Sequence, residues 1–429
     1  MFSVRAGSGG LDRRASTMVL IHGAYTAANL LAATFLSIFL WRASHDLARV
    51  ALFTWISAVT IPAAFLLNGL VLRRAGAGTS IRIGLACLGV VYLAVLALGN
   101  ASVNWILPLG LLRGLGEGWY WAGYHLTTYD TTSERDRDRY FGAMGAVNCF
   151  LSGGLPPLAG AAIVIGAQWG GMDRGYQFIF GLAGVLLLAA MVLAGRLRCG
   201  YRPAFSIRTM AQLHLRNQPW LNVMGARLAD GFSGMLSGVV LTILAYMVLN
   251  NEQQVGNFNG IMGILGVGIS LALAAYMRPR HRIACALVGA ALLVTSTLVL
   301  PLYLSAWALV AFGLLRAVGG PLHGNGLAPL ALQVIDRDPQ ARSLRYEYIV
   351  HQELCLAVGR VLSIGFFLVL AAPADQLLLA RIVVAVSGAA PMVIWAAFAR
   401  IAQPAAPLVA ETATVDNGEV DPRALPAAA

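Results

Sequence analysis

Twelve apolar stretches of about twenty residues recur along the chain, and they restrict its fold more than any other feature. Wound as a helix, a stretch of this length spans the hydrocarbon layer of a bilayer. Because an unpaired backbone group in hydrocarbon is costly, we expect every stretch to be helical. The stretches are residues 17–41, 48–72, 82–99, 104–127, 140–166, 175–195, 220–249, 256–277, 283–303, 306–330, 347–371 and 376–400.

The composition supports the membrane class. The chain is 58% hydrophobic and 11% charged, and its mean hydropathy is +0.72. A soluble core cannot hold so many apolar side chains, so the surplus is expected to face lipid. The sequence therefore predicts an all-α, multi-pass membrane protein with twelve transmembrane helices.

The thirty basic residues are all arginines, and the loops share them unequally. With both termini inside, seventeen lie in the five cytosolic loops and four in the external loops. The positive-inside rule then predicts cytosolic termini, in a bacterial inner membrane or in an organelle membrane. The net charge of +11 comes from these helix-end arginines. They form no basic groove, so nucleic-acid binding is not expected. We expect a monomer.

One run of residues occurs twice, about two hundred positions apart. Leu111–Gly116 recurs in similar form as Leu314–Gly319, and each copy places an arginine in the middle of an apolar stretch. A duplicated half of this kind is typical of secondary transporters. We expect two pseudo-symmetric halves, organised as an N-terminal six-helix bundle (1–195), a cytosolic linker (196–219), a C-terminal six-helix bundle (220–400) and a disordered cytosolic tail (401–429). The linker is either an interfacial segment or a solvated connector.

Several further runs carry a resemblance to a known family. They are Asn68–Gly76, Arg113–Gly118, Leu155–Gly160, Phe39–Trp41 and Tyr346–Val350. With the twelve stretches and the central loop, the first three resemble the major facilitator superfamily: its helix 2–3 loop, its helix 4 arginine motif and its helix 5 antiporter motif. The last two are similar to a bacterial branch that includes glycolipid-flipping and efflux carriers. A fainter resemblance leads to carriers of iron-handling membranes.

The chain departs from the superfamily pattern at two positions. Arg73 stands where the family has an acidic residue, and Leu155 replaces the glycine before the first proline of the antiporter motif. The first departure puts the usual salt bridge between the bundles in doubt. The second weakens the inference of export.

The predicted fourth helix has the richest set of polar residues. Arg113 and Glu117 are four apart, and Tyr120 and Tyr124 continue the stripe at helical spacing. Ionisable groups in a bilayer are expensive and often mark a transport path. We interpret this face as a cavity wall where Arg113 binds an anion and Glu117 exchanges a proton. The alternative is an Arg–Glu pair that merely neutralises itself.

Other helices add further candidates. Arginine cannot release a proton near neutrality, so carboxylates and histidines are the coupling candidates. The proton-coupling residues are expected to be Glu117 and Asp230, although Asp230 could instead form a structural pair with Arg227. The expected substrate-binding residues are Tyr25, Asn29, Arg113, Tyr120, Tyr124, Asn148, Arg316, His323 and Asn325. Each of these could instead make only a packing or helix-to-helix contact.

Charged residues at the cytosolic helix ends are candidates for gating. Asp130 can meet Arg74, and Asp336 can meet Arg278 or Arg280, when the cytosolic side closes. Solvated loop charges that contribute about 0–1 kcal/mol each are the alternative.

The sequence contains no enzyme motif and no Gly-Lys-Ser/Thr phosphate loop, so we expect neither catalysis nor ATP hydrolysis, and no cofactor or metal site. The expected function is proton-coupled export of a small amphipathic organic molecule by alternating access. Uptake or organelle loading of a small solute such as iron or a siderophore is the first alternative. A membrane scaffold or receptor that transports nothing is the second.

Overall fold

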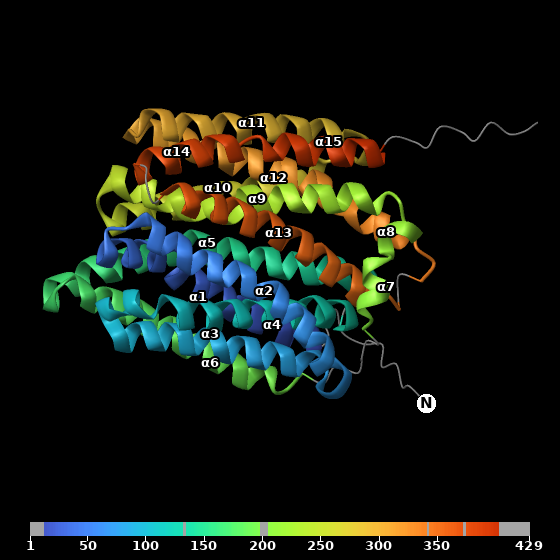
Figure 1. The fold of residues 1–429 in the computed structure, drawn as a ribbon, viewed down its shortest axis with the longest axis horizontal. Helices are drawn as coiled ribbons and strands as arrows, with labels where there is room; N and C mark the ends of the chain where they lie inside the picture. Colours follow the sequence, from blue (N-terminus) through green and yellow to red (C-terminus); the bar gives the residue numbers. More distant parts are fainter. Residues whose placement is uncertain (1–12, 132–133, 198–204, 341–342, 372–374, 403–429) are drawn as a thin grey trace, which may run out of the picture.

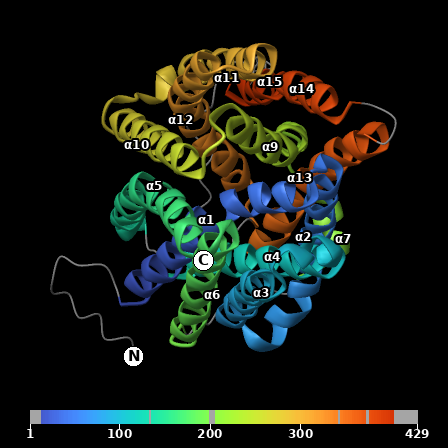
Figure 2. The ribbon, with the colours of Figure 1, turned by 90° about the vertical axis from the view of Figure 1, so that its left-hand side faces the viewer.

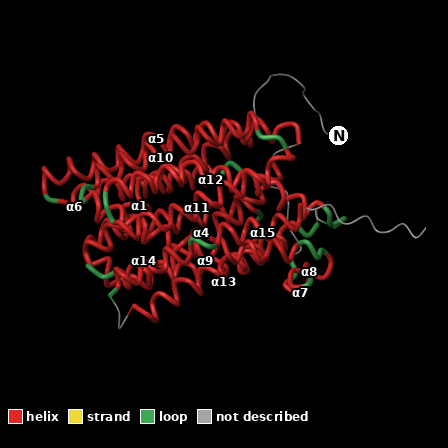
Figure 3. Tube along the Cα trace, turned by 90° about the horizontal axis from the view of Figure 1, so that it is seen from above, coloured by secondary structure: helices red, strands yellow, loops and turns green. Residues whose placement is uncertain are grey.

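The structure is a computed structural model that describes residues 13–131, 134–197, 205–340, 343–371 and 375–402. These residues form long helices and contain no strand (Figure 3). Eleven segments are long and apolar enough to cross a membrane. One of them, Ala77–Thr128, contains two long helices joined by a 3-10 turn, so the number of crossings is twelve. The predicted all-α fold with twelve transmembrane helices is confirmed.

The first six crossings are α1 Arg13–Ser44, α2 Leu47–Ala75, α3 Ala77–Leu98, α4 Ile106–Thr131, α5 Glu134–Gly170 and α6 Met172–Ala194, with the 3-10 turn η1 Gly99–Trp105 before α4. Two short helices follow, α7 Ile207–Ala211 and α8 Leu213–Arg216. The last six crossings are α9 Trp220–Leu249, α10 Glu252–Tyr276, α11 Arg282–Tyr303, α12 Ala306–Asp336, α13 Arg345–Ala371 and the pair α14 Gln376–Ser387 and α15 Ala390–Ala402, with η2 Pro279–His281 before α11.

The last crossing differs from the single helix that its apolar stretch predicts. It is interrupted between α14 and α15, next to Gly388. A Cβ atom at Gly388 would lie 2.0 Å from the Thr297 hydroxyl oxygen of α11. This close approach of two helices requires glycine, and residue spacing along one helix cannot show which neighbour comes so near. The predicted tail, 401–429, lies outside the described residues except for the end of α15.

The helices form two groups. Helices α1–α6 occupy the lower part of Figure 1 and α9–α15 the upper part. Viewed end-on, α5 lies beside α10 and α2 beside α13, so the groups meet along two seams (Figure 2). We call α1–α6 the N-terminal group and α9–α15 the C-terminal group. The end that carries α7 and α8 is the linker end, and the opposite end is the far end.

Close packing of α4 on α2 decides which face of α4 remains free. A Cβ atom at Gly114 would lie 2.6 Å from the Ser57 carbonyl oxygen, and one at Gly118 would lie 2.5 Å from the Ala64 Cβ. Small residues at this spacing let two membrane helices approach closely. With these glycines against α2, the side chains of Arg113 and Glu117 lie beside the contact.

The described part of the linker docks on both groups. The Phe205 ring lies against Gly69 of α2 and makes an edge contact with Tyr346 of α13, with ring centroids 5.3 Å apart. The Ser206 backbone N–H donates to Glu347 Oε1 at 3.1 Å. Buried Met210 adds an apolar contact. Residues 205–219 are therefore held against the protein rather than forming a free connector.

Candidate functional site

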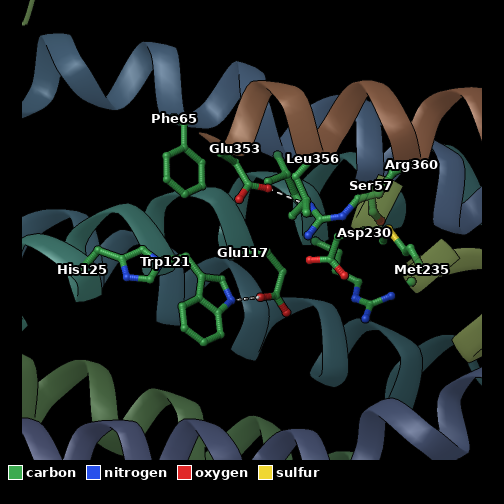
Figure 4. Close-up of a pocket in the computed structure, with 13 residues that line it drawn as sticks. Ser57, Phe65, Glu117, Trp121, His125, Asp230, Met235, Glu353, Leu356 and Arg360 are labelled. Atoms are coloured by element: carbon green, nitrogen blue, oxygen red, sulfur yellow. Dashed lines mark hydrogen bonds and ion pairs between the residues drawn. The ribbon is translucent and has the colours of Figure 1, made fainter. Parts of the chain in front are cut away.

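A cavity of about 380 Å³ lies between the two groups of helices. Helices α2 and α4 line it from the N-terminal group, and α9 and α13 line it from the C-terminal group (Figure 4). The charged residues in its wall are Arg113, Glu117, Asp230, Glu353 and Arg360. A site shared by both groups is where a relative movement of the groups changes access.

Glu117 is held by two neutral donors of the N-terminal group. The Tyr25 hydroxyl donates to Glu117 Oε2 at 2.6 Å, and the Trp121 indole N–H donates to the same oxygen at 3.0 Å. Figure 4 shows the Glu117 carboxylate and the Trp121 ring on one side of the cavity. Glu117 is thus fixed in place without a cation.

Arg113 lies one helical turn from Glu117, yet among the described residues it makes no ion pair. Its guanidinium lies over the Phe53 ring, 5.4 Å from the ring centroid. Arg113 is half-buried, and a cation–π contact compensates only part of the water that such a cation loses. The self-neutralising Arg113–Glu117 pair does not form, and Arg113 remains available to an anion.

The C-terminal wall carries two internal ion pairs. Arg360 donates to Glu353 at 2.7 Å. Arg227 lies 3.5 Å from Asp230. The Asp230 side chain is 47% exposed, so the cavity reaches it despite this pairing. The charges of this wall are therefore largely balanced before a ligand enters.

Apolar and aromatic side chains fill the remaining wall. They are Ile61, Phe65, Trp121, Met235 and Leu356, with Ser57, His125 and Gly234 between them. Ligand sites generally combine such surfaces with a few placed polar groups. The site suits a molecule that has an apolar body and a charged group.

Three predicted substrate-binding tyrosines form a layer behind this wall. Tyr120 is fully buried, and its hydroxyl lies 2.7 Å from His22 Nδ1. Tyr25 stacks on Tyr120 with ring centroids 3.9 Å apart, and Tyr124 stacks on His22 at 4.3 Å. Helix α1 covers these rings, so they support Glu117 from behind. Their direct contact with substrate stays a prediction.

Two aromatic rings that reach the cavity, Trp121 and His125, were not among the predicted site residues. They lie at every fourth position of α4 after Arg113 and Glu117, on the same side of the helix. That spacing is visible in the sequence, but Tyr120 and Tyr124 lie closer to the direction of Arg113 on a helix, and tryptophan in membrane helices is most often an interfacial anchor.

The other predicted binding residues do not line this cavity. Asn29 accepts a hydrogen bond from Tyr92 at 3.4 Å. Asn148 is half-buried on α5, Asn325 is exposed, and Arg316 lies over the Phe312 ring, 5.5 Å from its centroid. His323 lines a second cavity of the C-terminal group.

The structure describes the side chains of some of the predicted gating residues but not of others. Arg74, Arg278 and Arg280 are exposed at the linker end, and Arg280 Nε donates to His281 at 3.1 Å. The side chains of Asp130 and Asp336 lie outside the described residues, so the predicted bridges stay predictions.

The far end has a charged connection that the sequence reasoning missed. Arg42 of α1 forms an ion pair with Glu252 of α10, and the Tyr176 hydroxyl donates to the same Glu252 oxygen at 2.9 Å. Only 3% of the Glu252 side chain is exposed. This cluster joins the N-terminal group to the C-terminal group across a buried contact.

No group of three or more histidine, cysteine or acidic residues within the described ranges is placed to hold a metal ion.

The chain is similar in sequence to one protein family and to two bacterial proteins. The family model described as Major Facilitator Superfamily matches residues 13–344. The chain is 25% identical over 357 residues to the uncharacterized protein YqgE of Bacillus subtilis (strain 168), covering 83% of this chain and 82% of that protein. It is 28% identical over 179 residues to an uncharacterized protein in the sodM 3' region of Geobacillus stearothermophilus, covering 42% of this chain and 82% of that one.

Solved transporter structures share the fold at low sequence identity. A POT family transporter in complex with a thioalcohol-conjugated peptide has a TM-score of 0.68 at 11% identity, covering 91% of this chain and 97% of that chain. A bacterial homologue of the iron transporter ferroportin, in an inward-facing state, has a TM-score of 0.65 at 14% identity, covering 92% and 100%. The nucleoside transporter NupG has a TM-score of 0.64 at 10% identity, also covering 92% and 100%.

The family match spans most of the sequence, and the twelve crossings in two groups agree with it. The chain has a transporter fold rather than an enzyme's, and it belongs to the Major Facilitator Superfamily.

Proposed function

We propose that this protein is a proton-coupled secondary transporter that exports a small amphipathic organic molecule by alternating access. The observation that carries the proposal is the unpaired Arg113 guanidinium in a largely apolar cavity between the two groups. A cation in this position costs free energy in the empty protein, and an anionic ligand compensates that cost.

The cavity supports recognition of two parts of one molecule. An anionic group of the substrate binds Arg113 by charge-assisted hydrogen bonds. The apolar body then contacts Phe65, Met235 and Leu356, and a ring in the substrate can stack on Trp121. This division favours amphipathic anions over small polar solutes.

Glu117 is the proposed proton carrier, with Asp230 as the second candidate. Both hydrogen bonds to Glu117 end on Oε2, which leaves Oε1 to accept a proton. Glu117 lies one turn from Arg113, so gain or loss of its proton changes the charge that a substrate anion meets at the guanidinium. Proton and substrate then influence each other through one helical turn of α4.

Alternating access needs two rigid parts. We propose that the N-terminal and C-terminal groups act as the two bundles, joined by the linker 196–219. The Arg42–Glu252 pair closes the far end. At the linker end the Tyr346 hydroxyl donates to the Phe65 carbonyl oxygen at 2.6 Å and joins α13 to α2. Each contact favours closure of its own end.

Thermal stability of the purified protein against a ligand panel tests the substrate class. The panel contains amphipathic organic anions, their uncharged analogues, sugars, siderophores and divalent metal ions. A ligand at about 100 times its Kd adds roughly 2.7 kcal/mol to the free energy of unfolding. We expect stabilisation by the amphipathic anions and not by their uncharged analogues.

The Arg113→Ala variant should lose that stabilisation. The matched control is Arg49→Ala, which removes an exposed arginine whose Nε lies 3.7 Å from Asp46 at the far end. Equal stabilisation of Arg113→Ala and the wild-type protein by the anions would refute the assigned binding role.

Uptake or organelle loading of a metal cation is the second candidate. Three carboxylates, Glu117, Asp230 and Glu353, line the cavity and give it acidic groups that attract a cation, although in this structure these described residues are not grouped closely enough to hold a metal ion together. One similar solved structure is a homologue of an iron transporter, although at that identity the likeness shows the fold alone. Stabilisation of the wild-type protein by divalent metal ions alone, lost in Glu117→Gln, would favour this candidate over export of an anion.

A further inference from the structure

A second cavity of about 230 Å³ lies inside the C-terminal group, between α9, α12 and α15. Its polar wall is formed by Arg227 and Asp230 of α9 and His323 of α12. Asp230 also lines the cavity between the two groups. The Asp230 carboxylate thus lines both cavities.

His323 presents an unpartnered nitrogen in this part of the protein. The residue is 8% exposed, and its Nδ1 lies 3.2 Å from the Ala286 carbonyl oxygen of α11. A carbonyl oxygen only accepts, so Nδ1 carries the hydrogen. In the neutral ring Nε2 then carries a lone pair, and this buried atom has no hydrogen-bond partner. Arg227 Nε is likewise buried without a partner.

Unpartnered buried polar atoms beside a cavity of this size are satisfied by water. The charged groups of the cavity wall that face His323 are Arg227 and Asp230. Helix α11 contributes the Ala286 carbonyl, and α15 contributes Ile394 and Phe398. His323 and Asp230 both line this cavity, so water that enters it can contact both side chains.

We propose that the second cavity is a hydrated proton branch in which His323 passes protons to Asp230, separate from the substrate cavity. A hydronium ion in the cavity gives its proton to Nε2, which forms the imidazolium and leaves a neutral water, while the Nδ1–H bond to Ala286 is kept. Nε2 then returns that proton to a bridging water, which protonates an Asp230 oxygen. The ring ends neutral, and one proton has moved.

This inference rests on the proposed proton coupling and gives the proton a route of its own. A ligand that fills the cavity between the groups would leave this route to Asp230 open. His323 is then a relay residue and not a substrate-binding one.

Gly324 supplies a test that leaves the histidine in place. A Cβ at Gly324, which lines the cavity, would meet no atom within 4 Å, so a larger side chain enters the empty space. Gly320, one turn earlier, also has open space around its Cβ position. Gly324→Leu should displace the water, and Gly320→Leu is the matched control.

The experiment follows the Asp230 carboxyl band by time-resolved infrared spectroscopy after a light-triggered release of protons. Asp230→Asn identifies the band, and the probe is the proton itself. Every protein in the series carries Gly234→Leu, whose side chain enters the open space of the cavity between the groups beside Asp230 and hinders direct protonation from that side. His323→Gln and Gly324→Leu should each slow protonation of Asp230 by roughly a hundredfold, the lower end of what one proton-transferring group contributes. Gly320→Leu should keep the wild-type rate.

Wild-type rates in both His323→Gln and Gly324→Leu would overturn the branch, as would equal slowing in Gly320→Leu. The absence of an Asp230 band that responds to the proton pulse would also overturn it. Failure of the proposed function would be seen in a different experiment. Substrate flux in proteoliposomes would then not depend on the pH gradient, whatever the infrared rates are.

Discussion

The Arg42–Glu252 pair allows a quantitative prediction for Glu252→Gln. In the structure this pair is the centre of a buried contact between α1 and α10, which Tyr176 completes. When the far end opens, both charged groups enter water. The substitution keeps the shape of the side chain and an acceptor for Tyr176, but it removes the charge that faces Arg42.

The expected size follows from the burial. Only 3% of the Glu252 side chain and 29% of the Arg42 side chain are exposed, so solvent screens the pair weakly. A hydrogen bond to a charged group contributes about 1.5–3 kcal/mol and a neutral one about 0.5–1.5 kcal/mol. Adding the cost of an unpaired guanidinium, we take about 2 kcal/mol, or roughly a 30-fold shift toward the far-end-open state. A population of about one in a hundred would rise to roughly a quarter.

Double electron–electron resonance measures this shift directly. Spin labels at exposed Ala101 and Gln254 report the separation of the two groups at the far end, in a background without native cysteines. Glu252→Gln should add a longer-distance population. Arg49→Gln, which removes an exposed ion pair at the same end within one helix, should not. Identical distance distributions for Glu252→Gln and the wild-type protein would refute the reasoning.

Three further substitutions test other contacts. Glu117→Gln should abolish pH-driven substrate flux in proteoliposomes and keep ligand-induced stabilisation, because Arg113 is untouched. Tyr346→Phe removes the hydroxyl that donates to the Phe65 carbonyl at 2.6 Å, so it should destabilise closure of the linker end by about 1 kcal/mol, measured by spin-label distances at that end. Gly388→Ala places a Cβ about where the Thr297 hydroxyl lies, and it should lower the free energy of unfolding by about 1–3 kcal/mol in thermal denaturation.

Each of these has a contradicting result. Retained coupling in Glu117→Gln would transfer the proton role to Asp230. A far-end change in Tyr346→Phe would mean that the two ends are not separate closures. For Gly388→Ala the control is Gly320→Ala, where the new methyl meets open space. Equal destabilisation of both variants would show that helix flexibility, and not the close approach to α11, sets the cost.

The sequence predicted the features that depend on local pattern. Apolar length gave the twelve crossings, because the thickness of hydrocarbon sets how many residues a helix needs. The spacing of Arg113 and Glu117 put both on one accessible face of α4, and both line the cavity. The run at Leu314–Gly319 lies in α12, but its Arg316 lies outside that cavity, and the duplication stays a prediction.

The features that sequence pattern missed depend on which helices become neighbours. Tyr120 shares a direction with Arg113, yet α1 covers it, and periodicity cannot tell a covered face from an open one. Arg42 and Glu252 stand 210 residues apart, and each resembles an ordinary helix-end charge until the two groups meet. The predicted orientation is defined relative to the two sides of a membrane, and it stays a prediction.

The seam between α5 and α10 has a mechanical consequence. Pro156 and Pro157 have no backbone N–H, so the carbonyls of Ser152 and Gly153 lose their usual helical partners. Cβ atoms at Gly263 and Gly260 of α10 would each lie 2.9 Å from one of these oxygens. Two backbones thus touch through weak C–H···O contacts, which lose little free energy when the angle between the helices changes. In the alternating access proposed above, the prolines that interrupt hydrogen bonding within α5 would provide the pivot about which one group tilts against the other.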